Sequence, residues 1–286
     1  EVTRTRHFGR AANNLYVSQS TVSTRIRMLE DAVGIPLFTR DRNNIQLTSA
    51  GLRLLGHAET VVSTWSRTLQ DVAVAQDDQI MLVIGGMPSM WDIILGEWIS
   101  LIYENKPELV INAEMYSYNQ LLVHLIDRTV DLGFMFDYPN HSDLEVIELG
   151  AINIIMVSTE ANMSVAEALQ GQYVYVDWGT SFAVSHARAF PDLPPTRLRV
   201  AQGRMAYDFL LQNGGAAFLA EPMLKEVLNA GRMHLIPGAP SIQRHAYAVF
   251  HTRSDRRQNI LDALRLLPQK PTLKQVEFND TAILGR

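Results

Sequence analysis

The stretch from residue 18 to residue 48, SQSTVSTRIRMLEDAVGIPLFTRDRNNIQLT, decides the fold of the N-terminal part of the chain. Ser18 is a typical N-cap residue, because its hydroxyl accepts a hydrogen bond from a backbone amide that the first helical turn leaves unpaired. Gly34 is typical of a residue that ends a helix, and Pro36 prevents the helix from resuming. The stretch therefore predicts a helix from Gln19 to about Val33.

The two faces of this helix differ in chemistry. Apolar residues recur at helical spacing and predict one buried face, made of Val22, Ile26, Leu29 and Val33. The other face carries short hydroxyl side chains and arginines: Ser20, Thr21, Ser23, Thr24, Arg25 and Arg27. Short hydroxyls allow the backbone to approach DNA closely, and arginines reach phosphates or guanine edges. An ordinary solvated surface helix is the alternative, and the helix alone does not decide between them.

The residues around this helix favour a DNA-binding module. Residues 8–15 predict a short preceding helix. After it, two short strand-like runs, 37–40 and 45–47, are separated by a turn-forming tetrapeptide and predict a β-hairpin. Arg40, Arg42 and Asn43 lie at or beside the tip of this hairpin. Two helices followed by such a hairpin indicate a winged helix-turn-helix.

A long helix is predicted from Thr48 to about Gln76. Its apolar residues alternate spacings of three and four, a repeat of 3.5 residues, at Leu55, Ala58, Val62, Trp65, Leu69 and Val72. This period favours a narrow seam that pairs with another helix. The alternative is packing on its own domain, but the seam is longer than the small head can cover. We therefore expect these six residues to form a dimer interface with a second copy of the chain.

The net charge differs between the N-terminal residues and the rest of the chain. The net charge of the 286 residues is −5, yet residues 1–58 hold eight arginines against four acidic residues, a net charge of +4 that leaves −9 for the remainder. A basic head and an acidic body suggest that only the head meets an anion. The chain has no cysteine, which excludes disulfides and thiolate metal sites. No apolar run approaches a membrane span, and we expect no membrane partner and a cytoplasmic protein.

The N-terminal motifs together resemble the LysR-type transcriptional regulators. The resemblance is dense and collinear across residues 8–55 and rests on Phe8-Gly9-Arg10-Ala11-Ala12, Leu15, Val17-Ser18-Gln19-Ser20, Val22-Ser23, Ile26, Leu29-Glu30, Gly34, Leu37-Phe38, Arg40, Leu47-Thr48 and Ala50-Gly51. Residues 4–12 and 42–45 also resemble the HdfR-like branch of this family. The resemblance implies a first helix that begins before Glu1.

The same resemblance assigns DNA contacts to individual residues. It implies a recognition helix over residues 18–30, with a wing that follows it. The implied contacts are Ser18, Gln19, Ser20, Thr21, Ser23, Thr24, Arg25 and Arg27 from the helix, and Arg40, Arg42 and Asn43 from the wing. It implies double-stranded DNA as the partner, with an interrupted inverted repeat as the operator of a homodimer or homotetramer.

The body of the chain alternates strand-like and helix-like segments. Expected strands include residues 80–85, 110–115, 132–136, 152–158 and 245–252, with helices between them. This alternation predicts an α/β domain with parallel sheets covered by helices on both faces. Residues 130–133 and 214–222 match recurring segments of the same family, whose effector domain resembles a periplasmic binding protein with two subdomains.

These observations predict four regions of the chain. Residues 1–47 form the winged helix-turn-helix, residues 48–78 the linker and dimerisation helix, and residues 79–268 the effector-binding domain. Within that domain, subdomain I covers about 79–151 and 245–268, and subdomain II covers about 152–244. Residues 269–286 form a C-terminal tail.

Candidate ligand-binding residues follow from the rule that ligands bind beyond the carboxyl ends of strands, beside helix N-termini. They are Ser89, Met90, Trp91, Phe136, Trp178, Thr180, Gln202 and Arg204. Each also has an ordinary structural interpretation, as a helix cap, as a packing aromatic or, for Arg204, as a solvated cation. We expect a small-molecule effector here and neither a resident cofactor nor a metal.

The sequence thus predicts a sequence-specific DNA-binding transcription regulator whose DNA binding is modulated by a small molecule. The chain carries no nucleophile elbow, no phosphate-binding glycine loop and no paired-histidine metal motif, so we do not expect an enzyme. A solute-binding receptor and a protein-interaction module without DNA binding are the alternatives that the sequence leaves open.

Overall fold

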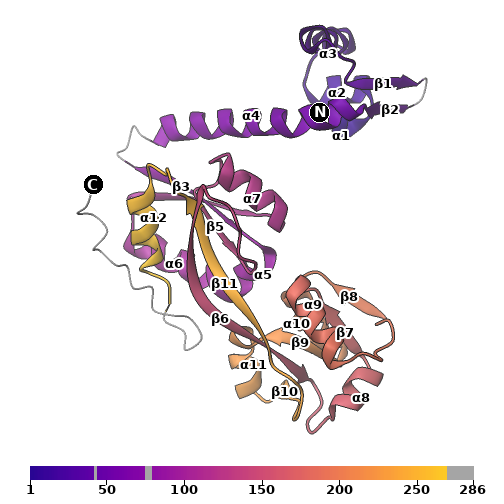
Figure 1. The fold of residues 1–286 in the computed structure, drawn as a ribbon, viewed down its shortest axis with the longest axis vertical. Coiled ribbons are helices and arrows are strands. Elements are labelled where there is room, and N and C mark those ends of the chain that lie inside the picture. The colour runs from indigo at the N-terminus through magenta and orange to yellow at the C-terminus, as the bar shows by residue number, and fades with distance from the viewer. Residues whose placement is uncertain (42–43, 75–78, 269–286) are drawn as a thin grey trace. The chain divides into compact units, whose positions relative to one another are not determined.

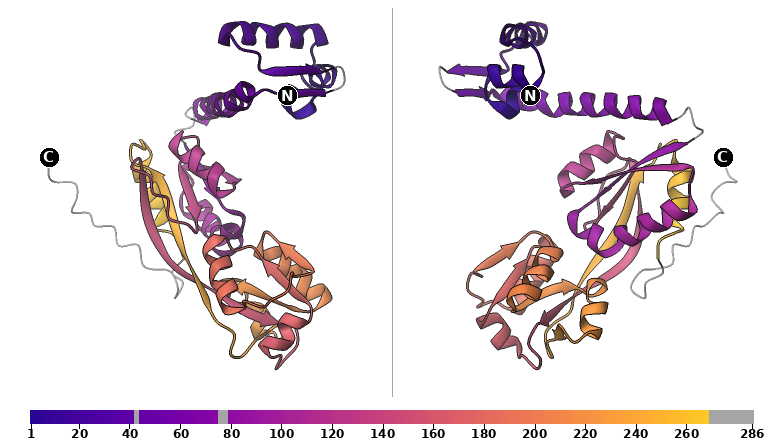
Figure 2. Two further views of the ribbon diagram at one scale, coloured as in Figure 1. Left: turned by 45° about the vertical axis from the view of Figure 1, so that its right-hand side comes forward. Right: turned by 180° about the vertical axis from the view of Figure 1, so that it is seen from behind.

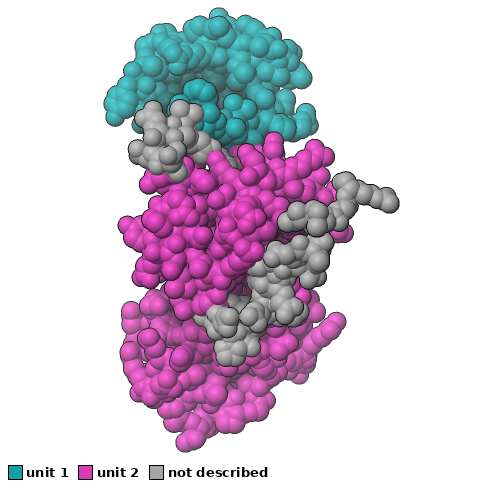
Figure 3. Space-filling model, turned by 90° about the vertical axis from the view of Figure 1, so that its left-hand side faces the viewer, with its two compact units in different colours: residues 1–69 teal, residues 70–286 magenta. Residues whose placement is uncertain are grey.

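The computed structural model describes residues 1–41, 44–74 and 79–268 (Figure 1, Figure 2). The chain divides into two compact units, residues 1–69 and residues 70–286 (Figure 3). We call them unit 1 and unit 2 and describe each by itself.

Unit 1 has the predicted order of helices followed by a hairpin and a long helix. Its elements are α1 (Val2–Thr5), α2 (Phe8–Asn14), α3 (Gln19–Val33), β1 (Phe38–Asp41), β2 (Asn44–Leu47) and the start of α4 (Ser49–Val74). β1 and β2 pair antiparallel, with Phe38 opposite Leu47. Two helices and a wing that precede a long helix confirm the winged helix-turn-helix expected from the sequence.

Local capping explains where α3 begins and ends. The Ser18 hydroxyl accepts a hydrogen bond of 3.1 Å from the amide of Thr21. Gly34 has a φ of 74°, which favours glycine, and its amide donates to the carbonyl oxygen of Glu30. The helix therefore has the bounds predicted from these two residues.

The wing is joined to both neighbouring helices. One carboxylate oxygen of Glu30 accepts hydrogen bonds from the amides of Leu37 and Phe38, at 2.8 and 3.2 Å. On the other side, a Cβ atom at Gly51 would lie 2.2 Å from the carbonyl oxygen of Leu37. Only glycine therefore allows α4 to approach the start of the wing this closely.

The predicted buried face of α3 is only partly buried in this chain. Val22 is 4% exposed and Ile26 is half-buried, but Leu29 and Val33 are each 43% exposed. The expectation for these last two residues is therefore wrong for the single chain. The reason is that Leu29 borders an open apolar groove of about 250 Å³ beside Leu37 and α4.

Unit 2 is built on one nine-stranded mixed sheet of order β4-β3-β5-β11-β6-β9-β7-β8, with β10 paired to β6. The strands are β3 (Ile80–Gly86), β4 (Leu109–Met115), β5 (Leu132–Met135), β6 (Leu144–Ser158), β7 (Tyr173–Val176), β8 (Leu198–Val200), β9 (Ala216–Ala220), β10 (His234–Leu235) and β11 (Ile242–His251). β3 is parallel to β4 and β5, and β7 is parallel to β8 and β9.

Two long strands pass through the middle of this sheet and join its two ends (Figure 2). β6 and β11 pair antiparallel: Leu144 lies opposite His251 at one end and Ile154 lies opposite Ile242 at the other. The register shifts between Ala246 and Tyr247. The expectation of parallel sheets is therefore correct only outside these strands. The sheet is mixed because β11 runs antiparallel to both of its neighbours, β5 and β6, and β6 also runs antiparallel to β9.

The helices of unit 2 fall into two groups, which lie around opposite ends of β6 and β11 (Figure 1). We call the group with β3, β4 and β5 subdomain I; its helices are α5 (Pro88–Met90), the π-helix η2 (Trp91–Leu95), α6 (Gly96–Asn105), α7 (Tyr118–Ile126) and α12 (Arg257–Leu264). The group with β7, β8 and β9 is subdomain II; its helices are α8 (Val165–Gln170), α9 (Thr180–Ala189), α10 (Gly203–Asn213), the 3-10 helix η3 (Glu221–Met223) and α11 (Lys225–Asn229).

The core of subdomain I shows why helices cover both faces of its sheet. Successive β3 side chains point to opposite faces, so Leu82 packs in one cluster with Trp98 of α6, while Val83 packs in another with Leu121 of α7. The indole nitrogen of Trp98 donates to the carbonyl oxygen of Ala263 in α12, at 2.8 Å. This arrangement confirms an α/β domain with helices on both faces.

Candidate DNA-binding surface and effector region

The outward face of α3 presents the polar residues selected from the sequence. Ser18, Gln19, Ser20, Thr24, Arg25 and Arg27 are exposed, while Thr21 and Ser23 are half-buried. The spacing of Ser20, Thr24 and Arg27 places them on one side of the helix, opposite the buried Val22. The structure therefore brings Ser20, Thr24 and Arg27 together on one surface, whereas the exposed Arg25 borders the apolar groove beside Val22 and Leu29. The role of these residues as DNA contacts stays a prediction.

Hydroxyl groups order the N-terminus of α3. The Ser18 hydroxyl lies 2.8 Å from the hydroxyls of both Ser20 and Thr21. The first turn of this helix is therefore fixed by its own side chains. Its amides give this end a partial positive charge that favours a phosphate.

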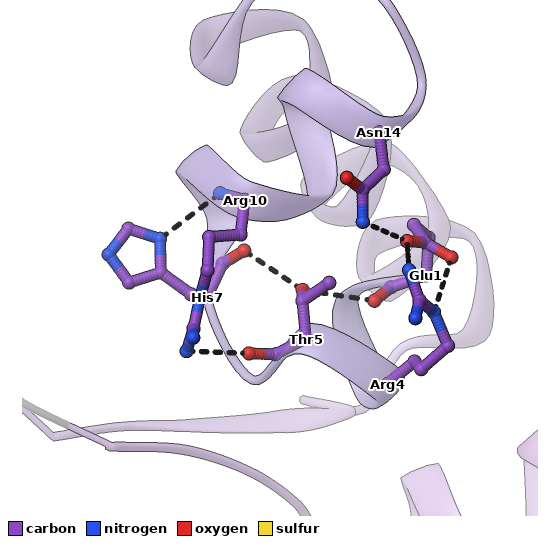
Figure 4. Close-up of polar contacts among 6 residues, drawn as sticks. All are labelled: Glu1, Arg4, Thr5, His7, Arg10 and Asn14. Atoms are coloured by element: carbon purple, nitrogen blue, oxygen red, sulfur yellow. Dashed lines mark hydrogen bonds and ion pairs between the residues drawn. The ribbon is translucent and has the colours of Figure 1, made fainter.

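A network of polar contacts joins Glu1, α1 and α2 (Figure 4). The Glu1 carboxylate accepts hydrogen bonds from Arg4 and Asn14, which lower the pKa of Glu1 to about 2. The Arg10 guanidinium donates to the carbonyl oxygen of Thr5, and the His7 ring accepts from the amide of Arg10. These contacts use Arg4 and Arg10 inside unit 1, whereas Arg25 and Arg27 extend from the exposed face of α3.

The wing is described only in part. The backbone of Arg40 pairs with Ile45 in the β1–β2 hairpin. Arg42 and Asn43 lie outside the described residues. The wing contacts predicted from the sequence stay predictions.

The predicted dimer seam of α4 is largely exposed in the single chain. Val62, Trp65 and Leu69 are 65%, 63% and 54% exposed, and Ala58 is exposed as well. Leu55 is half-buried, and Val72 lies in α4, but its side chain is outside the described residues. Exposed apolar side chains of this size are typical of interaction surfaces, and the role of this seam as a dimer interface stays a prediction.

In unit 2, several predicted ligand-binding residues meet where β5 and β7 end. The rings of Phe136 and Trp178 pack edge to face with centroids 6.3 Å apart. The Trp178 indole donates to the carbonyl oxygen of Phe218 at 2.9 Å, so this ring belongs to the core. Thr180 begins α9 directly after these residues and is exposed.

A second group of predicted residues joins the two subdomains. The Gln202 side chain donates to the Asp92 carboxylate at 2.8 Å and to the carbonyl oxygen of Pro88 at 3.5 Å. Burial raises the pKa of Asp92. Ser89 and Met90 are buried beside this contact, and the Trp91 indole donates to the carbonyl oxygen of Gly86.

Arg204, the cation that the sequence suggested for this region, forms an ion pair within its own helix. Its guanidinium pairs with Asp208, one turn further along α10, at 3.0 Å, and lies over the ring of Tyr207. Both side chains of the ion pair are about half exposed, which makes it a surface pair of small energetic value. Arg204 therefore matches its alternative interpretation as a surface residue of the first helical turn.

The buried cation of this region is Arg244, which the sequence reasoning missed. Its side chain is 2% exposed, and its Nη2 donates to the Asp137 carboxylate at 3.0 Å. Burial lowers the pKa of Arg244, and Asp137 opposes that effect. Its position in β11 could have indicated its burial, because Arg244 shares the buried face of the strand with Ile242 and Ala246. The predicted strand began at residue 245 and therefore left this arginine outside.

The described residues fit neither a membrane-spanning helix nor a cluster of metal ligands. No helix among them is long and apolar enough to cross a membrane. No cluster of three or more histidine, aspartate or glutamate side chains within them has the geometry of a metal site.

Comparison with known proteins connects these features. A family model for bacterial regulatory helix-turn-helix proteins of the LysR family matches residues 1–52, and one for the LysR substrate binding domain matches residues 75–270. The chain is 34% identical over 278 residues to the HTH-type transcriptional regulator HdfR of Yersinia enterocolitica, an alignment that covers 93% of this chain and 92% of that protein. HdfR of Yersinia pestis is also 34% identical, over 274 residues.

Solved structures show the same fold. CbnR, described as a LysR family transcriptional regulator, has a TM-score of 0.72 at 15% identity, covering 94% of this chain and 96% of CbnR. Full-length CbnR complexed with its target DNA has a TM-score of 0.70 at 16% identity, covering 92% and 95%. Both family models and the HdfR relatives lead to one conclusion: the chain belongs to the LysR family of bacterial transcriptional regulators.

Proposed function

We propose that the chain binds double-stranded DNA sequence-specifically through α3 and the β1–β2 wing, and that a small molecule in unit 2 modulates this binding. The observation that carries the proposal is the exposed polar surface of α3, where Ser20, Thr24 and Arg27 stand opposite the buried Val22 and where Arg25 is exposed as well. The net charge of +4 over residues 1–58 supports the same assignment. A positive surface of this kind attracts the phosphate backbone, and its side chains read base edges.

The residues proposed to contact DNA act in two ways. Arg25 and Arg27 reach phosphates or guanines, and the short side chains near the helix start allow close approach to the major groove. The full proposed set is Ser18, Gln19, Ser20, Thr21, Ser23, Thr24, Arg25, Arg27, Arg40, Arg42 and Asn43. CbnR, whose fold is similar, was crystallised with its target DNA, which is consistent with this assignment.

A homo-oligomer places two of these surfaces on one operator. The exposed seam of α4 suits a second copy, because Val62, Trp65 and Leu69 leave contact with water when two such helices pair. Two paired heads recognise an interrupted inverted repeat. A homodimer or homotetramer is the proposed state.

Unit 2 is the proposed effector domain, and its ligand binds between subdomains I and II. The proposed lining is Ser89, Met90, Trp91, Phe136, Trp178, Thr180, Gln202 and Arg204, of which Gln202 joins the two subdomains through Asp92. A ligand that prefers one arrangement of the subdomains shifts the population toward it. The proposal assigns the chain no catalytic step and places it in the cytoplasm with its DNA.

Retention of genomic DNA tests this function. The protein is mixed with fragmented genomic duplex at low ionic strength, retained fragments are sequenced, and their affinity is measured by fluorescence anisotropy across a salt series. We expect enriched fragments with an inverted repeat, and a logarithm of affinity that falls linearly with the logarithm of salt concentration. A solute-binding receptor or a protein-interaction module retains no duplex, and that result would contradict the proposal.

A further inference from the structure

Arg244 has one nitrogen that no group among the described residues satisfies. Its Nη2 binds Asp137, but its Nη1 is buried and has no hydrogen-bond partner there. Buried polar groups are nearly always paired, and an unpaired donor on a charged group is costly. This nitrogen therefore has a binding capacity that the protein itself does not use.

The unpaired nitrogen lies against the N-terminus of α9. A Cβ atom at Gly179, the N-cap residue, would be 3.0 Å from Nη1, so the backbone there passes directly beside the guanidinium. Gly179 has a φ of 92° and supplies no capping side chain to the ten-residue helix. Amides at the start of a helix favour an anion. Two independent features, a cation and a helix N-terminus, thus converge on one point.

Nearby carboxylates do not satisfy Nη1, because they are engaged elsewhere. Asp177 accepts hydrogen bonds from Arg199 at 2.8 Å and from the amide of Gly179 at 3.1 Å. The Asp137 oxygen binds Nη2 at 3.0 Å, and that side chain is 42% exposed. The Phe136 ring covers the guanidinium, whose carbon lies 5.2 Å from the ring centroid.

We propose that Nη1 of Arg244 and the first-turn amides of α9 bind the carboxylate of a small organic acid, which is the effector of this regulator. The identification as effector rests on the proposed function. A carboxylate fits better than a phosphate, because Asp137 and Asp177 flank the guanidinium and repel a doubly charged anion more strongly. The sequence suggested Arg204 as a cation of this region, and Arg244 is a second cation there, buried whereas Arg204 is exposed.

Binding at this point is coupled to movement of the subdomains. Nη1 is covered, so an acid reaches it only when the segments that follow β5 and β7 separate. Those segments meet through the Phe136–Trp178 ring contact, and Asp92 and Gln202 join the same two subdomains. A bound carboxylate therefore selects among subdomain arrangements, which is the property that an effector needs.

Thermal unfolding of the whole chain without DNA tests the proposal. The probes are sodium acetate, succinate and benzoate, with benzamide as the uncharged analogue of benzoate and inorganic phosphate as the competing anion. We expect at least one carboxylate to raise the melting temperature by about 2 °C or more near saturation. Benzamide and phosphate should not do so. No stabilisation by any of the carboxylates, or stabilisation by phosphate alone, would overturn the proposal.

Two variants locate the site. Arg244→Met should abolish the carboxylate-dependent shift while the ligand-free melting temperature holds or rises, because the exposed Asp137 can be hydrated once its partner is gone. Asp137→Asn should tighten carboxylate binding, because it removes a competing anion from the guanidinium. Arg232→Met, at an exposed position of unit 2, is the matched control and should behave as the parent protein does. An unchanged shift in Arg244→Met together with no gain in Asp137→Asn would refute the assignment.

A DNA-retention assay of the same proteins separates this proposal from the proposed function. Without a carboxylate, Arg244→Met should retain duplex as the parent protein does. Suppose that the parent retains no duplex and still shows a rise in melting temperature with carboxylate that depends on Arg244. That result would support the binding site and contradict the regulatory function.

Discussion

Gln202 donates a 2.8 Å hydrogen bond to the carboxylate of Asp92, and the two residues belong to different subdomains of unit 2. Gln202 precedes α10, whereas Asp92 lies in the π-helical turn that follows β3. π-helical turns are rare and often occur at functional sites. The contact therefore joins the subdomains at the point where we propose that the effector binds.

A double-mutant cycle measures the strength of this contact. Gln202→Ala and Asp92→Ala should each lower the free energy of unfolding, because each removes one hydrogen bond from a half-buried polar partner. The coupling energy between them should be about 1 kcal/mol. Urea unfolding of the four proteins gives this value. Strict additivity of the two substitutions would show that the hydrogen bond does not hold the subdomains together.

The exposed arginines of α3 predict a specific loss of DNA affinity. Arg25→Ala should weaken binding to selected fragments by about 1–3 kcal/mol if Arg25 reads a base, with a smaller loss on random duplex. If Arg25 touches phosphate only, the two losses should be equal and the salt slope should become shallower. Anisotropy titrations measure both. Arg232→Ala, exposed in unit 2, is the control, and an equal loss there would count against a role of α3.

The α4 seam predicts the oligomeric state. Trp65→Glu should weaken self-association by about 2 kcal/mol or more, because it places a charge where an apolar surface is buried on pairing. Thr64→Glu, exposed on the opposite side of α4, should leave association unchanged. Sedimentation equilibrium reports the mass relative to the 32.1 kDa chain. Identical behaviour of the two variants would argue against the seam.

The aromatic surroundings of His186 predict a pH dependence of unfolding. Its ring contacts Phe182 and Phe218, its Nε2 lies 2.7 Å from the Tyr173 hydroxyl, and burial lowers its pKa from 6.5. The unfolded chain therefore binds a proton at this histidine more readily than the folded chain. Stability should fall as the pH drops below about 6.5 and be unaffected by this group above that pH.

A variant that cannot titrate isolates this effect. The unfolding free energy of His186→Gln should decline less between pH 7 and pH 5 than that of the parent, although it starts lower. Parallel curves for the two proteins would contradict the account of His186.

The fold of unit 1 was predictable, because the residues that determine its helix ends act on neighbours that are close in sequence. Ser18 and Gly34 determine the bounds of α3 through contacts within one helical turn, and these bounds were correct. The exposure of Leu29 and Val33 was not predictable, because periodicity shows which face is apolar and not what covers it. The same limit applies to α4, whose seam is visible in the sequence but has no partner in a single chain.

In unit 2, the features that the sequence did not predict depend on contacts between residues far apart along the chain. The burial of Arg244 depends on its position in β11 and on Asp137, which lies 107 residues away along the chain. Ends of strands could be located from the alternation, so Phe136, Trp178 and Gln202 were correctly placed just beyond strand ends, while their role in ligand binding stays a prediction. A charged residue inside a crossing strand could not be placed, because the start of β11 depends on its register with β6.

The most direct test of the DNA-binding claim uses the absence of cysteine from the sequence. A single thiol introduced by Ser20→Cys carries a photoactivated crosslinker, and the same label at Arg232→Cys serves as the control. We predict crosslinks from position 20 to bases in both halves of the operator, and none from position 232. Tight binding of the labelled protein to its operator with no crosslink from position 20, or with equal yields from both positions, would contradict the account.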